Sequence, residues 1–368
     1  MTPSVSPKHL LLRTAETLLI AACGGLAFAL IGFPAGLVSG ALLTVAAVAL
    51  MGRPMTVPLS LARVISVLVG ISLGAVVTPE TLHGIAAFPL SIAVLTGATV
   101  CMIMATTAYL RRVHGWDAQS AVLGASPGAL AQVMTLSADC GADLRAIAIV
   151  QVMRVVLLTV GIPAGLALFG LSASGVGAPG AVAAGGSLAQ LAILVVVSTA
   201  TAFAMLKLRL PGGLIFGAMI SSGFLHGGGF IQSALPSWLV SVAVIGVGAV
   251  TGSRFANTDP RTLLRYLGAA FGSFAVAITI AFCFVLLLTT LLSVRVADAV
   301  VAFSPGAQDT MMVLALSLHL DPIFVGAHHL ARFVLVSLSL PFLLRRARKT
   351  LPPAAGERPP RTRVPFED

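Results

Sequence analysis

The chain has 368 residues, of which 58% are hydrophobic and 9% are charged, and its mean hydropathy is +1.03. Because a soluble domain carries about 25% charged residues, this composition excludes an ordinary soluble protein and indicates an integral membrane protein with several spans. The net charge of +10 does not indicate nucleic-acid binding, since the basic residues form short clusters between apolar runs and no basic stripe carries aromatic side chains for stacking on bases.

Apolar runs of about 20 residues, long enough to cross a bilayer, recur along the chain. The first continues past Cys23 to Ile31, which favours an uncleaved first span over a cleaved lipoprotein signal. Spans are predicted near residues 11–31, 34–52, 61–78, 86–110, 145–169, 187–206, 211–229, 237–253, 266–292 and 323–344. Two further segments, near residues 117–139 and 296–319, are less uniformly apolar and are interrupted by Pro-Gly.

One sequence pattern occurs twice, and its matched residues are 178 positions apart. It comprises a Ser-Pro-Gly-Ala motif followed by an aspartate, an arginine inside an apolar run and a proline. The first copy is Ser126, Pro127, Gly128, Ala129, Asp143, Arg154 and Pro163, and the second is Ser304, Pro305, Gly306, Ala307, Asp321, Arg332 and Pro341. The pairs Gly70/Gly248 and Gly74/Gly252 keep the same offset. A duplicated membrane sequence that retains a charge in each half is typical of transporters.

The distribution of basic residues decides how the two interrupted segments are drawn. If each segment crosses the membrane, the chain has twelve spans in two parallel halves, and Lys207 and Arg209 fall outside. If each segment enters and returns on the same side, the basic clusters become cytoplasmic, Arg254 included, and only Arg295 is left outside. The second arrangement predicts an all-α polytopic membrane protein with about ten spans and two re-entrant segments. It is an inverted repeat of two five-span halves, placed in the bacterial inner membrane with both termini cytoplasmic.

This arrangement divides the chain into four parts. Residues 11–170 form the first transmembrane repeat, and residues 187–344 form the second. Between them, residues 171–186 are a Gly/Ala-rich, uncharged linker, as expected of an external loop. Residues 345–368 are a basic, Pro-rich tail that we expect to be disordered on the cytoplasmic side.

The Ser-Pro-Gly-Ala motifs have the composition of a helix start within the membrane. Serine is a good N-cap and proline is favoured at the first helical position, so Ser126 and Ser304 are each expected to begin a short helix. The first N–H groups of such a helix have no partner within it, and with the helix dipole they attract anions. Two such ends entering from opposite faces would meet near the midplane and hold a negatively charged group. The alternative is a Pro-Gly kink that only shapes packing.

Arg154 and Arg332 each follow an aspartate by 11 residues, close to three helical turns, which puts them near the middle of the bilayer. A charge at that depth costs at least about 2.5–3.5 kcal/mol, so each needs a buried partner. Because a guanidinium fork binds both oxygens of a carboxylate, we predict that they bind an anionic substrate; the alternative is that they cap carbonyls at a broken helix. Asp143 and Asp321 are expected to cap the helices that follow, with an ion or proton site as the alternative.

The two halves differ in their remaining polar residues, which are Gln132 and Gln151 in the first and Gln308, Asp309, His328 and His329 in the second. The glutamines complete the predicted substrate-binding set. Asp309 and the two histidines are the main candidates for proton coupling, because histidine titrates near neutral pH. Adjacent histidines cannot form an i, i+4 metal pair and the four cysteines form no CxxC pair, so no metal site, cofactor or catalytic residue is predicted.

The stretch from Asp117 to Pro163 resembles the bacterial membrane family known as AbrB. The residues that carry the resemblance are Asp117, Pro127-Gly128-Ala129, Met134, Gly141-Ala142-Asp143, Gln151, Arg154 and Pro163, and it extends over about residues 15–345. Two departures are Ala129, where the family usually has a second glycine, and His329, where the second copy would have the equivalent of Gln151. The family is similar to cation/proton antiporters and anion transporters, which implies inverted five-span repeats with broken helices. Its members are also labelled transcriptional regulators or ammonia monooxygenases.

Together these features predict a secondary transporter of a small anion, an organic carboxylate, that works by alternating access. Its expected partners are that anion, the lipid bilayer and, in a homo-oligomer, other copies of the chain; direct nucleic-acid binding is not expected. One alternative is a membrane sensor that regulates gene expression through a soluble partner. A second, an ammonia monooxygenase, is disfavoured because no copper-type histidine cluster is present in the sequence, and we expect no enzymatic activity.

Overall fold

The computed structural model describes residues 7–77, 88–128, 130–171, 187–210, 212–256 and 258–349. All regular structure within these ranges is helical, which confirms the all-α prediction. The helices of the first half are α1 (Pro7–Leu30), α2 (Gly36–Leu50), α3 (Leu59–Ala75), α5 (Phe88–His114), α6 (Ala118–Ala125), α7 (Leu130–Cys140) and α8 (Leu144–Leu168). Those of the second half are α9 (Leu188–Lys207), α10 (Gly213–Gly227), α11 (Ser237–Gly252), the 3₁₀ turn η2 (Ser253–Phe255), α12 (Pro260–Leu291), α13 (Val296–Phe303), α14 (Gln308–Ser317) and α15 (Pro322–Lys349).

Seven of the described helices, namely α1, α5, α8, α9, α11 (with η2), α12 and α15, are long and apolar enough to cross a membrane. The helices α2, α3 and α10 are apolar but shorter. This set is consistent with a polytopic membrane protein. The predicted linker lies almost entirely outside the described residues, as does most of the predicted disordered tail. Because α15 continues to Lys349, Arg345 and Arg346 lie on this helix.

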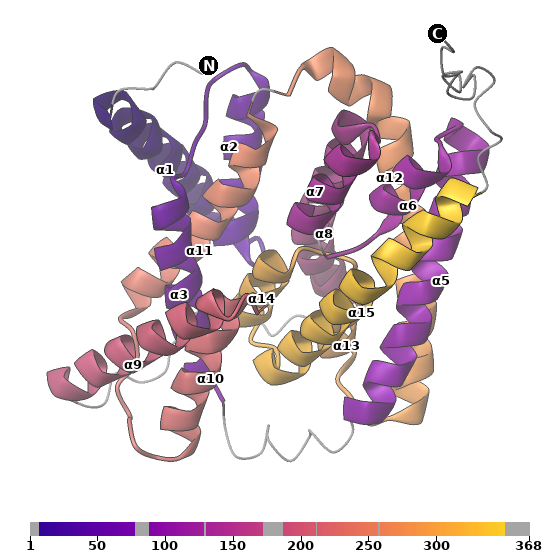
Figure 1. The fold of residues 1–368 in the computed structure, drawn as a ribbon. Coiled ribbons are helices and arrows are strands. Elements are labelled where there is room, and N and C mark those ends of the chain that lie inside the picture. The colour runs from indigo at the N-terminus through magenta and orange to yellow at the C-terminus, as the bar shows by residue number, and fades with distance from the viewer. Residues whose placement is uncertain are drawn as a thin grey trace, which may run out of the picture.

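The helices form two groups, and each group combines elements from both halves of the sequence (Figure 1). The first group contains α1, α2, α3, α9, α10 and α11, in which α3 packs along α10 and α2 along α11. The second contains α5 to α8 and α12 to α15, in which α5 packs along α12. Helix α14 contacts α3 and α11 of the first group, so it lies at the junction of the two (Figure 1).

Glycines matched between the two halves allow close helix contacts in the first group. A Cβ atom on Gly70 or Gly74 of α3 would overlap backbone carbonyls of α10. A Cβ on Gly248 or Gly252 of α11 would lie 2.7 Å from a backbone carbonyl of α2. Small residues let helix backbones approach in this way where lipid removes the hydrophobic drive between helices. The interfaces α3–α10 and α11–α2 therefore each join a helix of the first half to a helix of the second.

Replacing Gly74 tests this packing. We expect Gly74→Ala to lower the free energy of unfolding by about 1–3 kcal/mol, because the new methyl group overlaps the backbone of α10. The control is Gly165→Ala in α8, where nothing lies within 4 Å of an added Cβ. Thermal unfolding of detergent-purified protein measures both variants, and equal midpoints would contradict the close contact.

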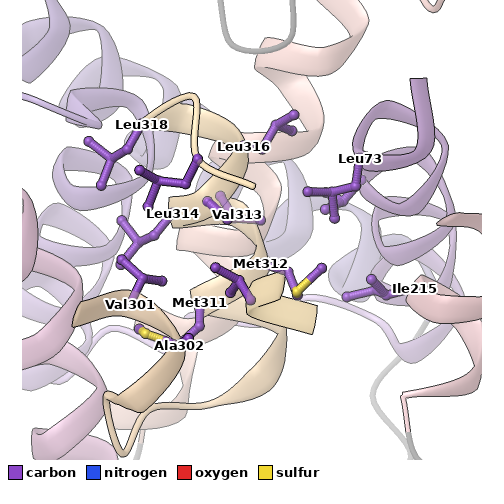
Figure 2. Close-up of a cluster of buried hydrophobic side chains, with 14 of the residues drawn as sticks. Leu73, Ile215, Val301, Ala302, Met311, Met312, Val313, Leu314, Leu316 and Leu318 are labelled. Carbon is purple, nitrogen blue, oxygen red and sulfur yellow. The ribbon is translucent and has the colours of Figure 1, made fainter. Parts of the chain in front are cut away.

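Helix α14 is the centre of the largest apolar core. Its residues Met311 to Leu316 are at most 3% exposed, so the helix is buried on all sides. Figure 2 shows these side chains between Leu73 of α3, Ile215 of α10 and Val301 of α13. Packing on every side fixes the position of α14, and with it the orientation of its N-terminus.

Candidate functional site

Each Ser-Pro-Gly-Ala motif joins two short helices whose outer ends lie close together. In the first half, the backbone N–H of Asp143, just after α7, donates to the Ser120 hydroxyl in the first turn of α6 at 3.1 Å. In the second half, the N–H of Asp321 donates to the Asp298 carboxylate in the first turn of α13 at 2.9 Å. Each pair of short helices therefore folds back on itself, with the motif at the turn.

The motif ends the first helix of each pair through its own chemistry. The Ser126 hydroxyl donates to the Val122 carbonyl at 2.8 Å, and the Ser304 hydroxyl donates to Val300 at 2.5 Å. The proline that follows has no N–H to continue the helix. In the first motif, Gly128 then adopts a left-handed φ of 84° that glycine accommodates without strain.

The prediction that the motif serines begin the following helices is wrong. Both serines cap the C-terminal end of the preceding helix, because their hydroxyls bond one turn backwards. Helix α14 begins at Gln308, and the residue before it, Ala307, offers no side-chain cap. The first N–H groups of α14 are thus left without a side-chain cap, as the anion-binding argument required.

Arg154 and Arg332 are each 1% exposed and hold the carbonyls at the broken helix ends. Arg154 Nη2 donates to the Gly124 carbonyl at 2.8 Å, and Arg332 Nη1 donates to the Phe303 carbonyl at 3.2 Å. These bonds satisfy carbonyls that have lost their helical partners. In the part of the chain that the structure describes, neither arginine forms an ion pair with a carboxylate.

His329 takes the place that Gln151 has in the first half. Gln151 Nε2 donates to the Leu123 carbonyl, and His329 Nε2 lies 3.1 Å from the Val301 carbonyl, 178 residues further on. His329 Nδ1 lies 2.6 Å from Arg332 Nη2, which can only donate. Because Nδ1 accepts from Arg332 and Nε2 donates to Val301, His329 is a neutral ring protonated at Nε2. The replacement of the expected glutamine by histidine therefore preserves the hydrogen bond to the carbonyl.

Substitutions at His329 test this equivalence. We expect His329→Gln to keep the native unfolding midpoint, because an amide can both donate to Val301 and accept from Arg332. His329→Ala removes the donor and should cost about 1–3 kcal/mol. Thermal unfolding of both variants measures the difference. A glutamine variant as unstable as the alanine variant would show that the two positions are not equivalent.

His328 points away from the motif and links α15 to α5. Its Nδ1 lies 2.7 Å from the Phe324 carbonyl and its Nε2 lies 2.8 Å from the Ser91 hydroxyl of α5. The rings of Phe88, Phe303 and Phe324 surround the imidazole. The side chain is fully buried within this contact between helices.

Asp143 and Asp321 cap the helices that follow them. Asp143 accepts from the backbone N–H groups of Arg145 and Ala146, and Asp321 accepts from those of Ile323 and Phe324. Asp143 also accepts from the Tyr266 hydroxyl of α12 at 2.8 Å. Burial raises the pKa of Asp143, but the hydrogen bonds outweigh it and hold the pKa below its ordinary value.

The lowered pKa of Asp143 gives a stability term with a defined sign. Because the ionised form is favoured in the folded state, its contribution is present above the unfolded pKa, about 3.9, and is lost as the pH falls through the folded pKa. We expect Asp143→Ala to lower stability by about 1 kcal/mol near neutral pH. Asp143→Asn should retain most of the cap and lose part of the acid-range pH dependence. Unfolding midpoints across the acid range measure both effects; an unchanged pH dependence in the asparagine variant would count against this role.

The two motif turns meet at a cavity of about 480 Å³ between the two helix groups, which we call the breakpoint cavity. A Cβ on Gly128 would lie 3.9 Å from the Gly306 carbonyl and 4.0 Å from Arg332 Nε, so the turns face each other. The second group lines it with Gly128, Gln151, Val155, Pro305, Gly306, Ala307, Gln308, Asp309 and Phe333. The first group lines it with Ser66, Leu206, Leu210, Gly212, Gly213, Leu214, Ile215 and Arg254.

Buried donors without partners gather at this cavity. Arg254 Nη1 and Gln308 Nε2 line it and have no hydrogen-bond partner, and Gln308 is only 8% exposed. Arg154 does not line the cavity but precedes the lining residue Val155 in the sequence, and its Nε and Nη1 also lack partners. Asp309 lies in the first turn of α14, where the helix dipole favours a carboxylate. The cavity therefore contains N–H donors that have no hydrogen-bond acceptor.

The structure brings together only some of the residues that the sequence singled out. Those that line the cavity are Gly128, Gln151, Pro305, Gly306, Ala307, Gln308 and Asp309. Those that do not line it are Ser126, Pro127, Ser304, Arg154, Arg332, His328, His329, Asp143 and Asp321. Ala129 and the side chain of Gln132 lie outside the described residues.

Sequence reasoning missed Arg254, which it grouped with the cytoplasmic basic residues. A signal was available in the repeat itself. The residues 178 positions before Arg254 and Asp309 are Val76 and Ala131, so this pair of opposite charges belongs to the second half alone. A charge that is present in one repeat and absent from the other allows the two halves to differ in function.

The all-helical fold, the long apolar helices and the buried helix breaks are consistent with a polytopic membrane protein, which is the class that fold and site define. The chain belongs to the AbrB family, since residues 37–348 match the family described as "Transition state regulatory protein AbrB". The resemblance seen in the sequence is thereby confirmed.

Two relatives extend this assignment. "Uncharacterized protein YhjN" of Bacillus subtilis (strain 168) is 24% identical over 357 residues, which cover 90% of this chain and 92% of the relative. "Putative regulator AbrB" of Escherichia coli (strain K12) is 27% identical over 241 residues, which cover 60% of this chain and 64% of the relative. No solved structure matches the chain. Neither printed name identifies a ligand.

Proposed function

We propose that this protein is a secondary transporter of a small anion, an organic carboxylate, which binds in the breakpoint cavity. The observation that carries the proposal is the pair of unpartnered donors there, on Arg254 and Gln308, together with the unpartnered donors of Arg154 outside the lining. A buried donor without an acceptor costs about 1–3 kcal/mol, so such groups need an explanation in a ligand or water. A carboxylate is suited to them because it accepts only, through two oxygens.

The rest of the cavity supports the same ligand class. The uncapped N-terminus of α14 opens on it and adds partial positive charge to the donors. The apolar part of the wall contains Leu206, Leu210 and Phe333 and suits the hydrocarbon part of an organic acid. A small carboxylate would place its charge at α14 and its carbon chain against this wall.

Transport is supported by where the cavity lies. It separates two helix groups that contact each other mainly through α14, α8 and their neighbours. In the proposal, the folded-back helix pairs are re-entrant segments that enter the membrane from opposite faces of an inverted repeat. The protein lies in the bacterial inner membrane with both termini cytoplasmic. Movement of one group against the other would expose the cavity to each side in turn.

The proposed roles follow from distance to the cavity. Arg254 and Gln308 bind the anion directly, while Arg154 and Arg332, which do not line the cavity, bind the carbonyls at the helix breaks and add positive charge to the region. Of the proton-coupling candidates, Asp309 is the best placed because it lines the cavity. The ligand is moved without chemical conversion, and the proposal requires no cofactor.

The family description and one relative's name favour a second candidate, a regulator that senses an anion in the same cavity. The two candidates differ in one measurement. Protein reconstituted in liposomes would take up a radiolabelled carboxylate if it is a transporter. Binding without any uptake would favour the sensor.

Neutralising Arg254 tests the binding site. Isothermal titration of detergent-purified protein with acetate, butyrate, benzoate and succinate should reveal at least one ligand. For that ligand, we expect Arg254→Gln to weaken affinity by about tenfold or more, because a hydrogen bond to a charged group is worth about 1.5–3 kcal/mol.

The matched control is Arg261→Gln, which removes an exposed arginine from the first turn of α12, outside the residues that line the cavity. This variant should bind like the native protein. Absence of binding by all four carboxylates, or an Arg254→Gln variant with native affinity, would overturn the proposal.

A further inference from the structure

Charges around the breakpoint cavity do not balance. Arg154, Arg332 and Arg254 contribute three positive charges, and Asp309 contributes the single described carboxylate that faces them. Arg332 is close enough to Arg154 for their like charges to interact, and its Nε lies 4.0 Å from a Cβ built on Gly128, which lines the cavity. Two positive charges are therefore left over among the described residues.

Helix dipoles do not remove this excess. The C-terminal ends of α6 and α13 each contribute about half a negative charge near the arginines that hold them. The N-terminal ends of α7 and α14 begin beside the same turns and contribute about half a positive charge each. The four helix ends therefore cancel, and the guanidinium charges remain.

Other ionisable side chains on the neighbouring helices do not supply the missing charge. His329 accepts a hydrogen bond from Arg332 and is neutral, and His328 is turned toward Ser91 of α5. Asp298 is already paired with Arg295 at the far end of α13, where Asp321 also lies. An excess of two charges in a buried region is unfavourable unless a ligand compensates it.

We propose that the anion carries two negative charges, so that the substrate class is a small dicarboxylate. This inference rests on the proposed function and deepens it. One carboxylate binds Arg254 and Gln308 at the α14 N-terminus. The second lies toward Gly128, which is close to Arg332, and toward Val155, which follows Arg154 with its unpartnered Nε and Nη1. Binding then brings the net charge of the region to zero with Asp309 ionised.

Matched ligands test the charge count without changing the protein. Malonate, succinate and glutarate are compared with their monomethyl esters, which keep the carbon chain and replace one carboxylate by a neutral ester. At pH 7.5, isothermal titration of the native protein should give at least a tenfold tighter dissociation constant for the best diacid than for its ester. An ester that binds as tightly as its diacid would overturn the inference and leave the proposed function intact.

Charge variants provide a second readout. Arg254→Gln reduces the excess to one positive charge, so the ratio of diacid to ester affinity should fall several-fold. Asp309→Asn raises the excess to three, so this ratio should stay the same or increase. Arg261→Gln serves again as the control, and thermal unfolding confirms that each variant is folded.

The outcomes separate the two proposals. A ratio unchanged by both cavity variants would overturn the dicarboxylate inference, because the preference would then not arise from these charges. Should Arg254→Gln fail to fold, the inference is tested by the ester series and by Asp309→Asn, in which a lower ratio of diacid to ester affinity would overturn it. If neither diacids nor esters bind, the dicarboxylate inference fails, and the proposed carboxylate function fails as well only if acetate, butyrate and benzoate also do not bind.

Discussion

Two helix breaks buried inside the protein impose the constraint on which the rest of the structure depends. Each break leaves backbone carbonyls without helical partners, in a region where water is scarce. Arg154 and Arg332 satisfy these carbonyls, with Gln151 and His329 in support. The constraint explains why each half contains a buried arginine, although burying its charge is costly. Without these arginines, the broken helices would carry unpaired carbonyl groups.

The same arrangement produces the candidate site. Once the arginines are committed to carbonyls, their charge remains uncompensated, and the uncapped end of α14 adds to the positive potential of the cavity. Close packing keeps this end in place, since α14 is surrounded by apolar side chains from several helices (Figure 2). Structure and binding are thus linked, because the elements that stabilise the breaks also prepare the surface that an anion would meet.

Agreement between sequence and structure is good where the signal is local. The apolar runs near residues 145–169 and 187–206 correspond to α8 and α9, and Asp143 and Asp321 cap helices as their composition indicated. The predicted role of the motif serines is wrong, because a serine hydroxyl before proline can bond either to the following helix or to the preceding one. Here the preceding helix supplies the carbonyl that it binds. The place of Arg254 in the cavity lining could not be read locally, since it depends on η2 sharing that cavity with the start of α14.

The sequence by itself determined the helical class, the duplicated pattern and the positions of the helix breaks. These features follow from hydrophobicity, proline and glycine, whose effects act over a few residues. Tertiary structure alone decided which breaks face each other, which carbonyls the arginines hold and which charges share a cavity. Those relations join residues far apart in the sequence, from Arg154 and Gly124, which are 30 positions apart, to Gly128 and Gly306 in different halves, and they arise from tertiary packing.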